Sequence, residues 1–395
     1  MTASGGGTRM LHGLTAPTGD GVITTLVPAL AAALDGAGPA LLPLPAGGRR
    51  EAVLAAMDTT QPLERDDIAL VIPTSGSTGE PKGVLLTANA LRAAADATHE
   101  RLGGAGQWLL ALPVSSIAGL TVLVRSLQAR TKPEILDLYA GFSVAAFADA
   151  TALMRTDVPR YTSLVPTQLR RLLDADNAAV DTLSTYDAVL IGGAALAPAL
   201  HHKATAAGVR IITTYGMSET CGGCVYDGRP LDRVTATITA DGRIELGGPT
   251  IFSGYRLRPD LTAEALIAGR HVTQDLGRWR DDGTLEILGR ADDVIVTGGM
   301  NVPAAMVERV LSGHPDVAAT AVVARPDAEW GQRVVAVVQP VDWSRIPTLD
   351  DLRTYATAHD LEPAALPREL VLTPLLPVLP SGKADKDAVR TLLGD

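Results

Sequence analysis

Short apolar runs alternate with longer amphipathic stretches between residues 68 and 215. Apolar runs of four or five residues are typical of strands buried in a parallel sheet, and longer stretches with helical spacing are typical of the helices that cover it. Strands are predicted at Ile68–Ile72, Leu109–Leu112, Tyr161–Val165, Ala188–Ile191 and Val209–Thr213. Helices are predicted at Asn89–Leu102, Leu120–Leu127, Thr167–Asp174 and Pro198–Ala207. The alternation predicts an α/β fold whose mainly parallel sheet carries helices on both faces.

The pattern changes after Val225 and again after Gly289. From Val225 to Leu288, short strand-like runs with turn residues between them predict a small β-rich subdomain. The rest of the chain has the pattern of a compact α+β unit, with elements predicted at Pro303–Leu311, Val317–Val323, Val334–Val338, Leu349–His359 and Asp387–Leu393. We therefore predict two domains, residues 1–289 and residues 290–395, with a boundary near Arg290 to Asp292.

The composition is that of an ordinary globular protein, and it matters mainly for what it excludes. Of the 395 residues, 46% are hydrophobic and 20% are charged, which suffices for large cores. The net charge of −10 argues against broad nucleic-acid binding. No apolar run approaches the ~18 residues of a membrane span, and Asp20 lies where a secretory signal would be apolar or positive. We expect a cytoplasmic protein, and the sequence leaves the oligomeric state open, a homo-oligomer included.

The two cysteines, Cys221 and Cys224, form an isolated Cys-Gly-Gly-Cys. A structural zinc site would need two more ligands at comparable spacing, and none follows nearby. A redox pair would be expected at the start of a helix in a thioredoxin-like pattern. We interpret the cysteines as small side chains that line a pocket, with a metal or redox role as the alternatives.

A loop rich in glycine and hydroxyl side chains follows the predicted strand Ile68–Ile72. Backbone N–H groups approach phosphates closely only where side chains are small, and hydroxyls and a lysine add further donors and charge. Lys82 is followed by Gly83 rather than Ser or Thr, so the spacing is not that of a Walker loop. A flexible linker is the alternative. The predicted phosphate-binding residues are Thr74, Ser75, Gly76, Ser77, Thr78, Gly79 and Lys82.

This segment resembles the phosphate loop of the adenylate-forming enzymes, which include acyl-CoA synthetases, adenylation domains of peptide synthetases and luciferases. The resemblance implies that the protein activates a carboxylic acid with ATP, releases pyrophosphate and passes the acyl group from AMP to a thiol such as coenzyme A. Four further motifs follow in the family's order. Together with the loop they span most of the chain.

The second motif, Tyr215 to Thr220, follows the predicted strand Val209–Thr213, and α/β sheets bind ligands at the carboxyl ends of their strands. By resemblance, Tyr215 stacks on adenine, with Gly216 and Met217 beside it, and Thr220 contacts the phosphate or the acyl carbonyl. Glu219 would hold Mg²⁺, because a carboxylate beside a polyphosphate needs an intervening cation. A surface turn with a solvated glutamate is the alternative.

Small residues are assigned to the same region. Gly193 and Ala194 follow the predicted strand Ala188–Ile191 and match the loop that flanks the adenine in the family. Gly192 and Gly222 are assigned to the acyl-substrate pocket. Without the resemblance, Gly192 to Ala194 would indicate no more than a tight turn between a strand and a helix.

The third motif contains Asp275, which matches the aspartate that binds the ribose hydroxyls in the family. Gln274 stands where relatives usually have glycine. Arg290 would also reach the ribose, and Asp292 matches the hinge about which a mobile C-terminal domain rotates between adenylation and thiol transfer. An interdomain network of salt bridges is the alternative for these three charged residues.

The last two motifs lie in the predicted C-terminal domain. Gly298 and Gly299 resemble the loop that lines the pantetheine tunnel during thiol transfer, although Val296 replaces a frequent lysine. Lys383, in a Pro-Ser-Gly-Lys sequence, matches the family's catalytic lysine. An ammonium group between the carboxylate and the α-phosphate would offset the charge that builds during in-line attack. An ordinary surface lysine is the alternative.

The identity of the acid is predicted from a narrower resemblance. From about residue 68 to residue 390 the chain resembles the actinobacterial o-succinylbenzoate–CoA ligases of menaquinone biosynthesis, and the segments that carry this resemblance are Thr162–Leu169, Tyr215–Gly228, Phe252–Tyr255 and Asp293–Gly299. The acid has two carboxylates, and Arg125 matches an arginine that would bind the one that is not activated. Arg125 could instead pair with a carboxylate in the core. Ser116 replaces a histidine that shapes the acyl pocket in relatives.

Two other functions remain open from the sequence. One is a ligase for another aryl or short acyl acid in secondary metabolism. The other is a non-catalytic nucleotide-binding protein of the same fold. The predicted small-molecule partners are a carboxylic acid, ATP with Mg²⁺, and coenzyme A; no nucleic acid and no membrane span are expected.

Overall fold

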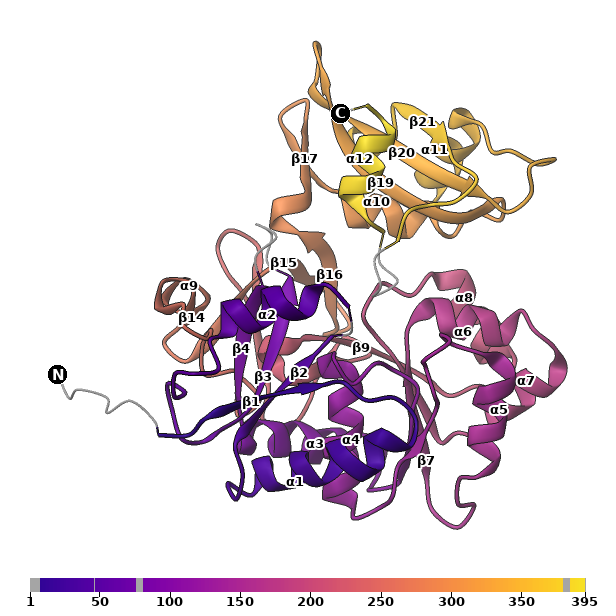
Figure 1. The fold of residues 1–395 in the computed structure, drawn as a ribbon. Coiled ribbons are helices and arrows are strands. Elements are labelled where there is room, and N and C mark those ends of the chain that lie inside the picture. Colours follow the sequence, from indigo (N-terminus) through magenta and orange to yellow (C-terminus); the bar gives the residue numbers. More distant parts are fainter. Residues whose placement is uncertain (1–7, 46, 76–80, 379–383, 395) are drawn as a thin grey trace. The chain divides into compact units, whose positions relative to one another are not determined.

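The computed structural model describes residues 8–45, 47–75, 81–378 and 384–394 (Figure 1). The chain divides into two compact units. Unit 1 comprises Met1–Gly192, Ala204–Thr237 and Glu245–Val272, and unit 2 comprises Gly193–Lys203, Ile238–Ile244 and Thr273–Asp395. The predicted domain boundary near Arg290 falls inside unit 2, and the division into residues 1–289 and 290–395 stays a prediction. None of the helices in the described ranges is long and apolar enough to cross a membrane.

A four-stranded sheet opens unit 1. Its strands are β1 (Leu11–Thr15), β2 (Ala40–Leu44), β3 (Ile68–Ser75) and β4 (Pro81–Thr87), in the order β1-β2-β3-β4. The first three strands are parallel, and β4 runs antiparallel to β3. Only β3 is predicted from the sequence. The strands β1 and β2 are five residues long and contain a glycine and a proline, residues that normally interrupt strands, so their pattern is weak.

A seven-stranded sheet forms the second sheet of unit 1, with the order β11-β10-β9-β8-β7-β5-β6. Strands β6, β5, β7, β8 and β9 are parallel, and β10 and β11 are antiparallel. The bounds are β5 (Gln107–Leu110), β6 (Glu134–Ile135), β7 (Arg160–Leu164), β8 (Ala188–Ile191), β9 (Ile211–Met217), β10 (Gly222–Tyr226) and β11 (Arg229–Pro230). The predicted mainly parallel sheet is therefore confirmed, because each strand predicted after residue 100 in the α/β region has a counterpart here.

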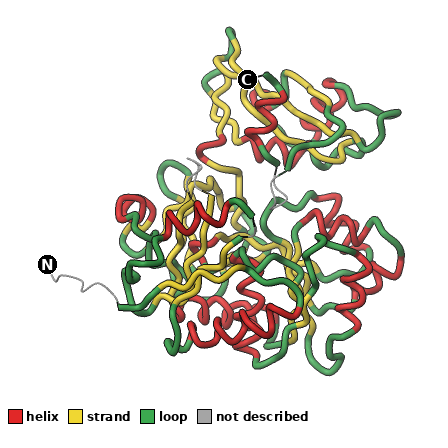
Figure 2. The backbone as a smooth tube through the Cα atoms, viewed as in Figure 1, coloured by secondary structure: helices red, strands yellow, loops and turns green. Residues whose placement is uncertain are grey.

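Helices separate and cover these sheets (Figure 2). They are α1 (Val27–Leu34), preceded by a π-helical turn at Val22–Leu26, α2 (Arg49–Met57), α3 (Ala88–Leu102), α4 (Ile117–Ala129), α5 (Val144–Ala152), α6 (Pro166–Leu173), α7 (Asn177–Ser184) and α8 (Pro198–Ala206). Helix α3 contacts β3, β4 and β10, and α4 contacts β5, β7 and β10, so both lie between the sheets. Helix α2 packs on β4 on the opposite side of the first sheet from α1 and α3, and α5 to α7 group on the far side of the second (Figure 1).

A smaller sheet follows in sequence. Its strands are β12 (Thr235–Ile238), β13 (Arg243–Gly247), β14 (Leu266–Ile267), β15 (Arg270–Trp279) and β16 (Leu285–Arg290), with α9 (Pro259–Ala265) before β14. Strand β15 pairs antiparallel with β14 at its beginning and with β16 at its end. These short strands agree with the small β-rich subdomain that is predicted from the turn residues between Val225 and Leu288.

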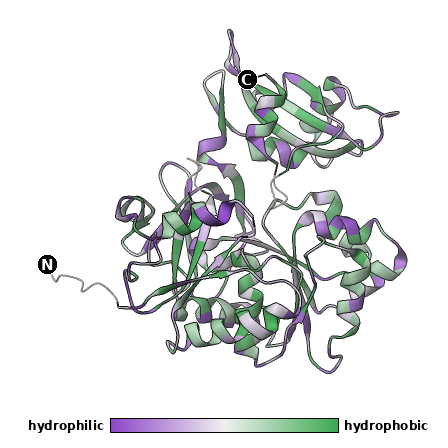
Figure 3. Cartoon of the chain, in the orientation of Figure 1, coloured by the Kyte–Doolittle hydropathy of each residue, from purple (hydrophilic) through white to green (hydrophobic). Residues whose placement is uncertain are grey.

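From Val294 onward the chain, all of it in unit 2, forms an α+β fold around a five-stranded sheet, with the order β18-β17-β20-β19 and β21 paired to β20. Its elements are β17 (Val294–Thr297), β18 (Met300–Pro303), α10 (Ala304–Leu311), β19 (Val317–Asp327), β20 (Gly331–Pro340), α11 (Leu349–Ala358), β21 (Glu369–Leu372) and α12 (Lys386–Leu392), with 3₁₀ turns at Ala291–Asp293 and Pro363–Ala365. Alternate residues of β19 and β20 face opposite sides of the sheet. Val322 and Val334 join the core under α10 and α11, whereas Val323 and Val335 join the core under α12. In Figure 3 the strands of this sheet are coloured mainly as hydrophobic, and hydrophilic residues occur along the neighbouring helices.

Candidate active site

The predicted phosphate loop connects the two strands of an antiparallel hairpin. Strand β3 continues to Ser75, and β4 begins at Pro81, with Thr74 opposite Lys82. The Thr74 hydroxyl donates a hydrogen bond to the Lys82 carbonyl at 3.4 Å. The structure therefore places Lys82 on a strand rather than in the loop, because the apolar run after it forms a second strand before α3. Gly76, Ser77, Thr78 and Gly79 lie outside the described residues.

Tyr255 connects Lys82 to Glu219. The Lys82 ammonium lies 4.8 Å from the centroid of the Tyr255 ring, and the Tyr255 hydroxyl donates a hydrogen bond to Glu219 Oε1 at 2.8 Å. Burial, together with the charge of Glu219, raises the pKa of Tyr255, so the phenol remains protonated and keeps donating. A lysine and a carboxylate that are predicted to serve the same polyphosphate thus share one aromatic neighbour. No motif assigned Tyr255 to the site, although Phe252–Tyr255 contributed to the resemblance.

Arg256, the next residue, fixes this tyrosine segment to the N-terminal part of unit 1. Its guanidinium group is 1% exposed and pairs with Glu64 at 3.1 Å. The remaining N–H groups donate to backbone carbonyls of Met57, Asp58, Gln61 and Pro62. The backbone N–H of Arg256 also donates a hydrogen bond to the Gly83 carbonyl at 2.8 Å, so the backbone beside Lys82 is held in place as well. A buried charge with this many partners is a strong positional constraint.

The second motif spans the end of β9 and the turn that follows. Tyr215, Gly216 and Met217 lie within β9, which ends four residues after the predicted strand, and Glu219 and Thr220 lie in a 3₁₀ turn at Ser218–Thr220. The strand is longer because it pairs with β10, with Gly216 opposite Gly223. A Cβ on Gly216 would lie 2.0 Å from the Gly222 carbonyl oxygen, so only glycine permits this approach.

Thr220 is buried and forms the turn between β9 and β10. Its hydroxyl accepts a hydrogen bond from the Met217 N–H at 2.9 Å and donates one to the Gly222 carbonyl at 2.7 Å. These bonds position Glu219 at the end of the strand. The predicted contact between Thr220 and a phosphate or acyl carbonyl stays a prediction.

Three residues assigned to the acyl pocket have local structural roles. Gly192 directly follows β8, and its N–H donates to the Leu164 carbonyl at 3.2 Å. Ser116 caps α4 by accepting from the Gly119 N–H at 3.3 Å, and its hydroxyl donates to the Pro113 carbonyl at 2.8 Å. Gly222 faces α4, where a Cβ would lie 3.4 Å from the Thr121 methyl group.

Arg125 lies one helical turn after Thr121 on α4 and is 3% exposed. Its Nη2 donates to the Tyr226 hydroxyl at 3.4 Å, and its guanidinium carbon lies 4.9 Å from the centroid of the Trp108 ring. Within the described ranges, Nε has no hydrogen-bond partner and no carboxylate forms an ion pair with this guanidinium. The alternative of a carboxylate partner in the core is therefore not found in the described structure. Thr121 faces Gly222 and Arg125 faces Tyr226, so α4 and β10 run alongside each other here.

The side chains around Arg125 are uncharged and hydrogen-bonded to one another. Trp108 Nε1 donates to His99 Nε2 at 3.3 Å, and the Thr98 and Tyr226 hydroxyls share a hydrogen bond of 3.0 Å. Burial, followed by the charge of Arg125, lowers the pKa of His99 to about 4. His99 is consequently neutral at physiological pH and adds no second positive charge beside Arg125.

The predicted ribose residues and the hinge residue form one charged cluster in unit 2. Asp275 on β15 lies opposite Arg290 on β16, with 3.9 Å between Oδ1 and Nη1. Arg290 binds both carboxylate oxygens of Asp292, at 2.8 and 2.7 Å. These hydrogen bonds raise the pKa of Arg290 and lower that of Asp292. Arg290 thus lies between the ribose-type aspartate and the hinge-type aspartate.

Gly298 and Gly299 form the two-residue turn of the hairpin β17–β18. Both have positive φ, +57° and +77°, which is the conformation that a tight hairpin turn of this length requires. Lys383 lies outside the described residues. On either side of its motif, Val378 and Ala384 pair as an isolated antiparallel bridge. Gly193, with φ of +80°, and Ala194 directly follow Gly192 at the carboxyl end of β8.

The two cysteines are fully buried, which agrees with small side chains in the interior. Burial raises the pKa of both thiols, that of Cys224 to about 12. Neither is therefore a thiolate at physiological pH. In the part of the chain that is described, no group of three or more His, Cys, Asp or Glu residues could hold a metal ion.

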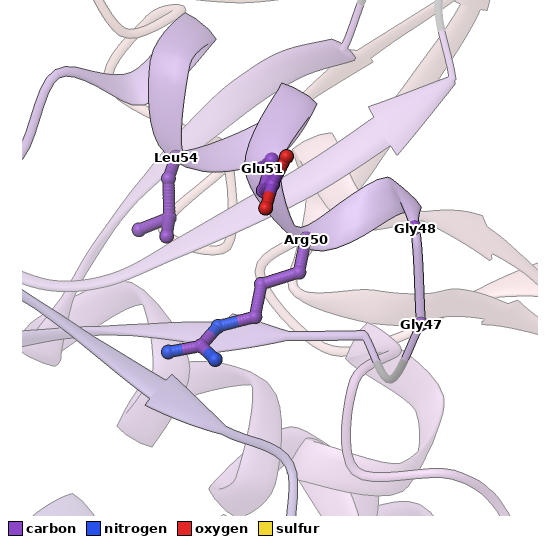
Figure 4. Close-up of a pocket in the computed structure, with 5 residues that line it drawn as sticks. All are labelled: Gly47, Gly48, Arg50, Glu51 and Leu54. Atoms are coloured by element: carbon purple, nitrogen blue, oxygen red, sulfur yellow. The ribbon is translucent and has the colours of Figure 1, made fainter.

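A cavity of about 560 Å³ lies at the start of α2, lined by Gly47, Gly48, Arg50, Glu51 and Leu54 (Figure 4). None of the residues assigned from the sequence motifs lines it. It combines one cationic and one anionic side chain without a convergent set of donors, and we assign no ligand to it.

Sequence comparison places this architecture in a known family. The chain matches the AMP-binding enzymes over residues 23–255 and the C-terminal domain of AMP-binding enzymes over residues 306–383. The protein therefore belongs to the AMP-binding enzyme family. This confirms the resemblance to the adenylate-forming enzymes, and with it the predicted α/β architecture with a C-terminal α+β part.

Individual relatives narrow the comparison. The chain is 45% identical over 392 residues, covering 98% of this chain and 99% of the relative, to a protein of Mycobacterium tuberculosis named "Probable 2-succinylbenzoate--CoA ligase". It is 30% identical to the 2-succinylbenzoate–CoA ligase of Geobacillus sp. (strain WCH70), over 83% of this chain and 70% of that protein. The Bacillus subtilis o-succinylbenzoate CoA synthetase, solved with its acyl-adenylate, superposes with a TM-score of 0.76 at 24% identity, covering 99% of this chain and 89% of that one.

Proposed function

We propose that this protein is an ATP-dependent, AMP-forming o-succinylbenzoate–CoA ligase that acts in menaquinone biosynthesis. The observation that carries the proposal is the 45% identity to the Mycobacterium tuberculosis relative over nearly the whole of both chains. The reaction has two steps. The acid carboxylate attacks the α-phosphorus of ATP to give the acyl-adenylate and pyrophosphate, and the CoA thiol then displaces AMP to give the thioester.

In the first step, the hairpin β3–β4 holds the phosphates. Among the described side chains, Thr74 and Lys82 are the proposed donors, and Lys82 supplies the positive charge. Glu219 suits Mg²⁺, because magnesium typically takes one or two carboxylates together with substrate phosphates. The Tyr255 hydroxyl, which donates a hydrogen bond to Glu219 Oε1, orients this carboxylate. Bound there, Mg²⁺ would neutralise charge on the phosphates as pyrophosphate leaves.

The nucleoside is assigned to residues of the second and third sequence motifs. Tyr215 stacks on the adenine, with Gly216 and Met217 beside it and Gly193 and Ala194 flanking it. Asp275 accepts hydrogen bonds from the ribose hydroxyls, and Arg290 contributes to the same site. Lys383 offsets the charge that develops between the carboxylate and the α-phosphate.

The second step is assigned to a different position of residues 290–395 after rotation about Asp292. The turn at Gly298 and Gly299 would then border the pantetheine arm of CoA. A turn without side chains allows the thiol-bearing chain to pass close to the backbone. The observation that supports this proposal is the two-residue hairpin turn itself, with both residues at positive φ.

Arg125 is proposed to bind the carboxylate of the acid that is not activated. The support is a buried guanidinium group whose described neighbours are neutral. Thr121 lies on α4 one helical turn before Arg125, and Gly222 on β10 faces it. Ser116, which replaces the histidine of relatives, directly precedes α4. Because serine is smaller than histidine, Ser116 should leave more room at this end of the proposed acyl pocket. The enzyme should therefore accept acids that are bulkier there.

The Tyr255–Glu219 hydrogen bond gives a prediction for the metal. We expect Tyr255→Phe to raise the Mg²⁺ concentration that gives half-maximal pyrophosphate release about tenfold, because Glu219 loses the donor that orients it. The Michaelis constant for the acid should stay unchanged. Tyr186→Phe is the matched control, since it also removes a buried hydroxyl, here one that is hydrogen-bonded to Thr151. If Tyr255→Phe required the same Mg²⁺ concentration as the parent, the proposal that Glu219, oriented by Tyr255, binds Mg²⁺ would be contradicted.

The function is tested by pyrophosphate release from ATP with a panel of carboxylic acids. We expect o-succinylbenzoate to give the highest kcat/KM. Preference for another aryl or short acyl acid would favour the alternative ligase in secondary metabolism. Absence of ATP consumption with every acid of a broad panel would leave only a nucleotide-binding protein of this fold.

A further inference from the structure

Arg309 connects two segments that lie on opposite sides of the hinge residue Asp292. Arg309 is on α10, after the hinge, and its partners are on β16, before it. Nη2 of Arg309 lies 2.8 Å from Glu286 Oε1, and Nη1 donates to the Ile287 carbonyl at 3.1 Å. All of these residues belong to unit 2. The guanidinium group therefore forms a two-point contact across the hinge.

Glu286 is an unusually well-paired carboxylate. Its side chain is 5% exposed and also pairs with Arg278 and Arg280, at 2.8 and 3.1 Å. Burial alone would raise its pKa, but the hydrogen bonds from Arg280 and Arg278 and the charge of Arg309 outweigh burial and lower the pKa to about 2. Glu286 is thus ionised throughout the physiological range, so the contact with Arg309 does not depend on pH there.

The three arginines around Glu286 are not equivalent. Arg278 and Arg280 precede the hinge, on β15 and directly after it, and their side chains are 66% and 54% exposed. Arg309 follows the hinge and is 27% exposed. An ion pair that is partly shielded from water is worth more than an exposed one. Of the three, Arg309 alone makes a contact that a rotation about Asp292 would alter.

Packing across the hinge agrees with this contact. Gly289, the residue before Arg290, has φ of +148°, and a Cβ there would lie 3.2 Å from the side chains of Pro303 and Ala305 at the start of α10. The end of β16 and the start of α10 are consequently in close contact. A large rotation of α10 relative to β16 would break both this packing and the hydrogen bonds of Arg309, because these contacts require the two segments to stay adjacent.

We propose that Arg309 and Glu286, which we call the cross-hinge pair, stabilise one of the two positions of the C-terminal domain, and that Arg309 is a positioning residue that sets the balance between the two half-reactions. The inference rests on the proposed function, because it requires one domain position for adenylation and another for thiol transfer. The cross-hinge pair exists in the position seen here and is broken in the other.

The ratio of the two half-reaction rates measures this balance directly. When the two positions interconvert faster than the chemistry, each half-reaction proceeds at a rate proportional to the population of its own position. Weakening the cross-hinge pair changes the ratio of the two populations by one factor, whichever position it stabilises. A general loss of structure would instead lower both rates together.

The test compares Arg309→Met with the parent protein. Methionine keeps much of the aliphatic stem but removes the charge and both hydrogen bonds. Acyl-adenylate formation is measured in single turnover with ATP and o-succinylbenzoate, and thioester formation is measured from preformed acyl-adenylate and CoA. We expect the ratio of the two rates to change about tenfold in Arg309→Met, the size typical of a lost hydrogen bond to a charged group. Arg309→Lys, which keeps the charge but not the two-point contact, should give an intermediate ratio.

The matched control is Arg280→Met. It removes an ion pair with the same carboxylate, Glu286, but on the same side of the hinge, so the ratio should stay within about twofold of the parent. A ratio in Arg309→Met that equals that of Arg280→Met, or an equal fall of both rates, would overturn the proposal. Failure of the proposed function is a different result, since the parent protein itself would then lack one or both half-reactions.

Discussion

Lys383→Ala should form the acyl-adenylate about 10²–10³-fold more slowly than the parent protein, the usual cost of removing one group that stabilises charge in a transition state. Only this step builds charge between the acid carboxylate and the α-phosphate. Supplied with preformed acyl-adenylate and CoA, the variant should therefore make the thioester at nearly the parent rate. The measurement is the same pair of single-turnover assays that separates the half-reactions.

Lys132→Ala provides the control for Lys383→Ala, because Lys132 is an exposed lysine on the surface of unit 1 and no motif includes it. Both of its half-reactions should equal those of the parent. If Lys383→Ala slowed both steps by the same factor, Lys383 would not be specific to adenylation. The assignment of the two steps to two domain positions would then lose its main support.

The second large effect is expected at Arg125. Arg125→Ala should raise the Michaelis constant for o-succinylbenzoate by roughly 10²–10³-fold, because leaving one member of a buried charge pair without its partner costs about 3–5 kcal/mol. The Michaelis constant for ATP should not change. Arg125→Met serves as the companion variant, since it retains a long side chain against Trp108 and should show the same loss without a cavity.

The substrate itself supplies the other half of this comparison. An acid with only one carboxylate, such as 3-benzoylpropionate, lacks the group that Arg125 is proposed to bind. The parent and both Arg125 variants should use this acid with similar kcat/KM. If the variants lost activity toward both acids equally, or kept the parent constant for o-succinylbenzoate, Arg125 would be a core residue whose charge is stabilised by Trp108 and Tyr226 alone.

The sequence predicts several central elements well because their apolar residues follow a clear helix or strand pattern. The helices α3, α4, α6 and α11 and the strand β8 lie where the apolar pattern places them. The strand β4 is missed because its polar beginning, Pro81 to Gly83, looks like the end of a loop. Its pairing with β3 depends on a register that only the folded hairpin sets.

The candidate site shows the same limit. The motifs around Thr74–Gly79, Glu219 and Asp275 are each a short continuous segment, so each can be recognised from a single sequence. Tyr255 is 36 residues from Glu219, and Arg256 is more than 190 residues from most of the carbonyl groups it binds. Contacts at such separations arise from folding, and no local pattern of residue types indicates them.

The central claim is that this protein joins o-succinylbenzoate to CoA through an acyl-adenylate, and product stoichiometry tests it most directly. The purified protein is incubated with Mg-ATP, o-succinylbenzoate and CoA, and AMP, pyrophosphate and the thioester are quantified together. The account predicts the three products in a 1:1:1 ratio, and acyl-adenylate that accumulates when CoA is omitted. ADP and inorganic phosphate in place of AMP and pyrophosphate, or AMP formed without any thioester, would contradict it.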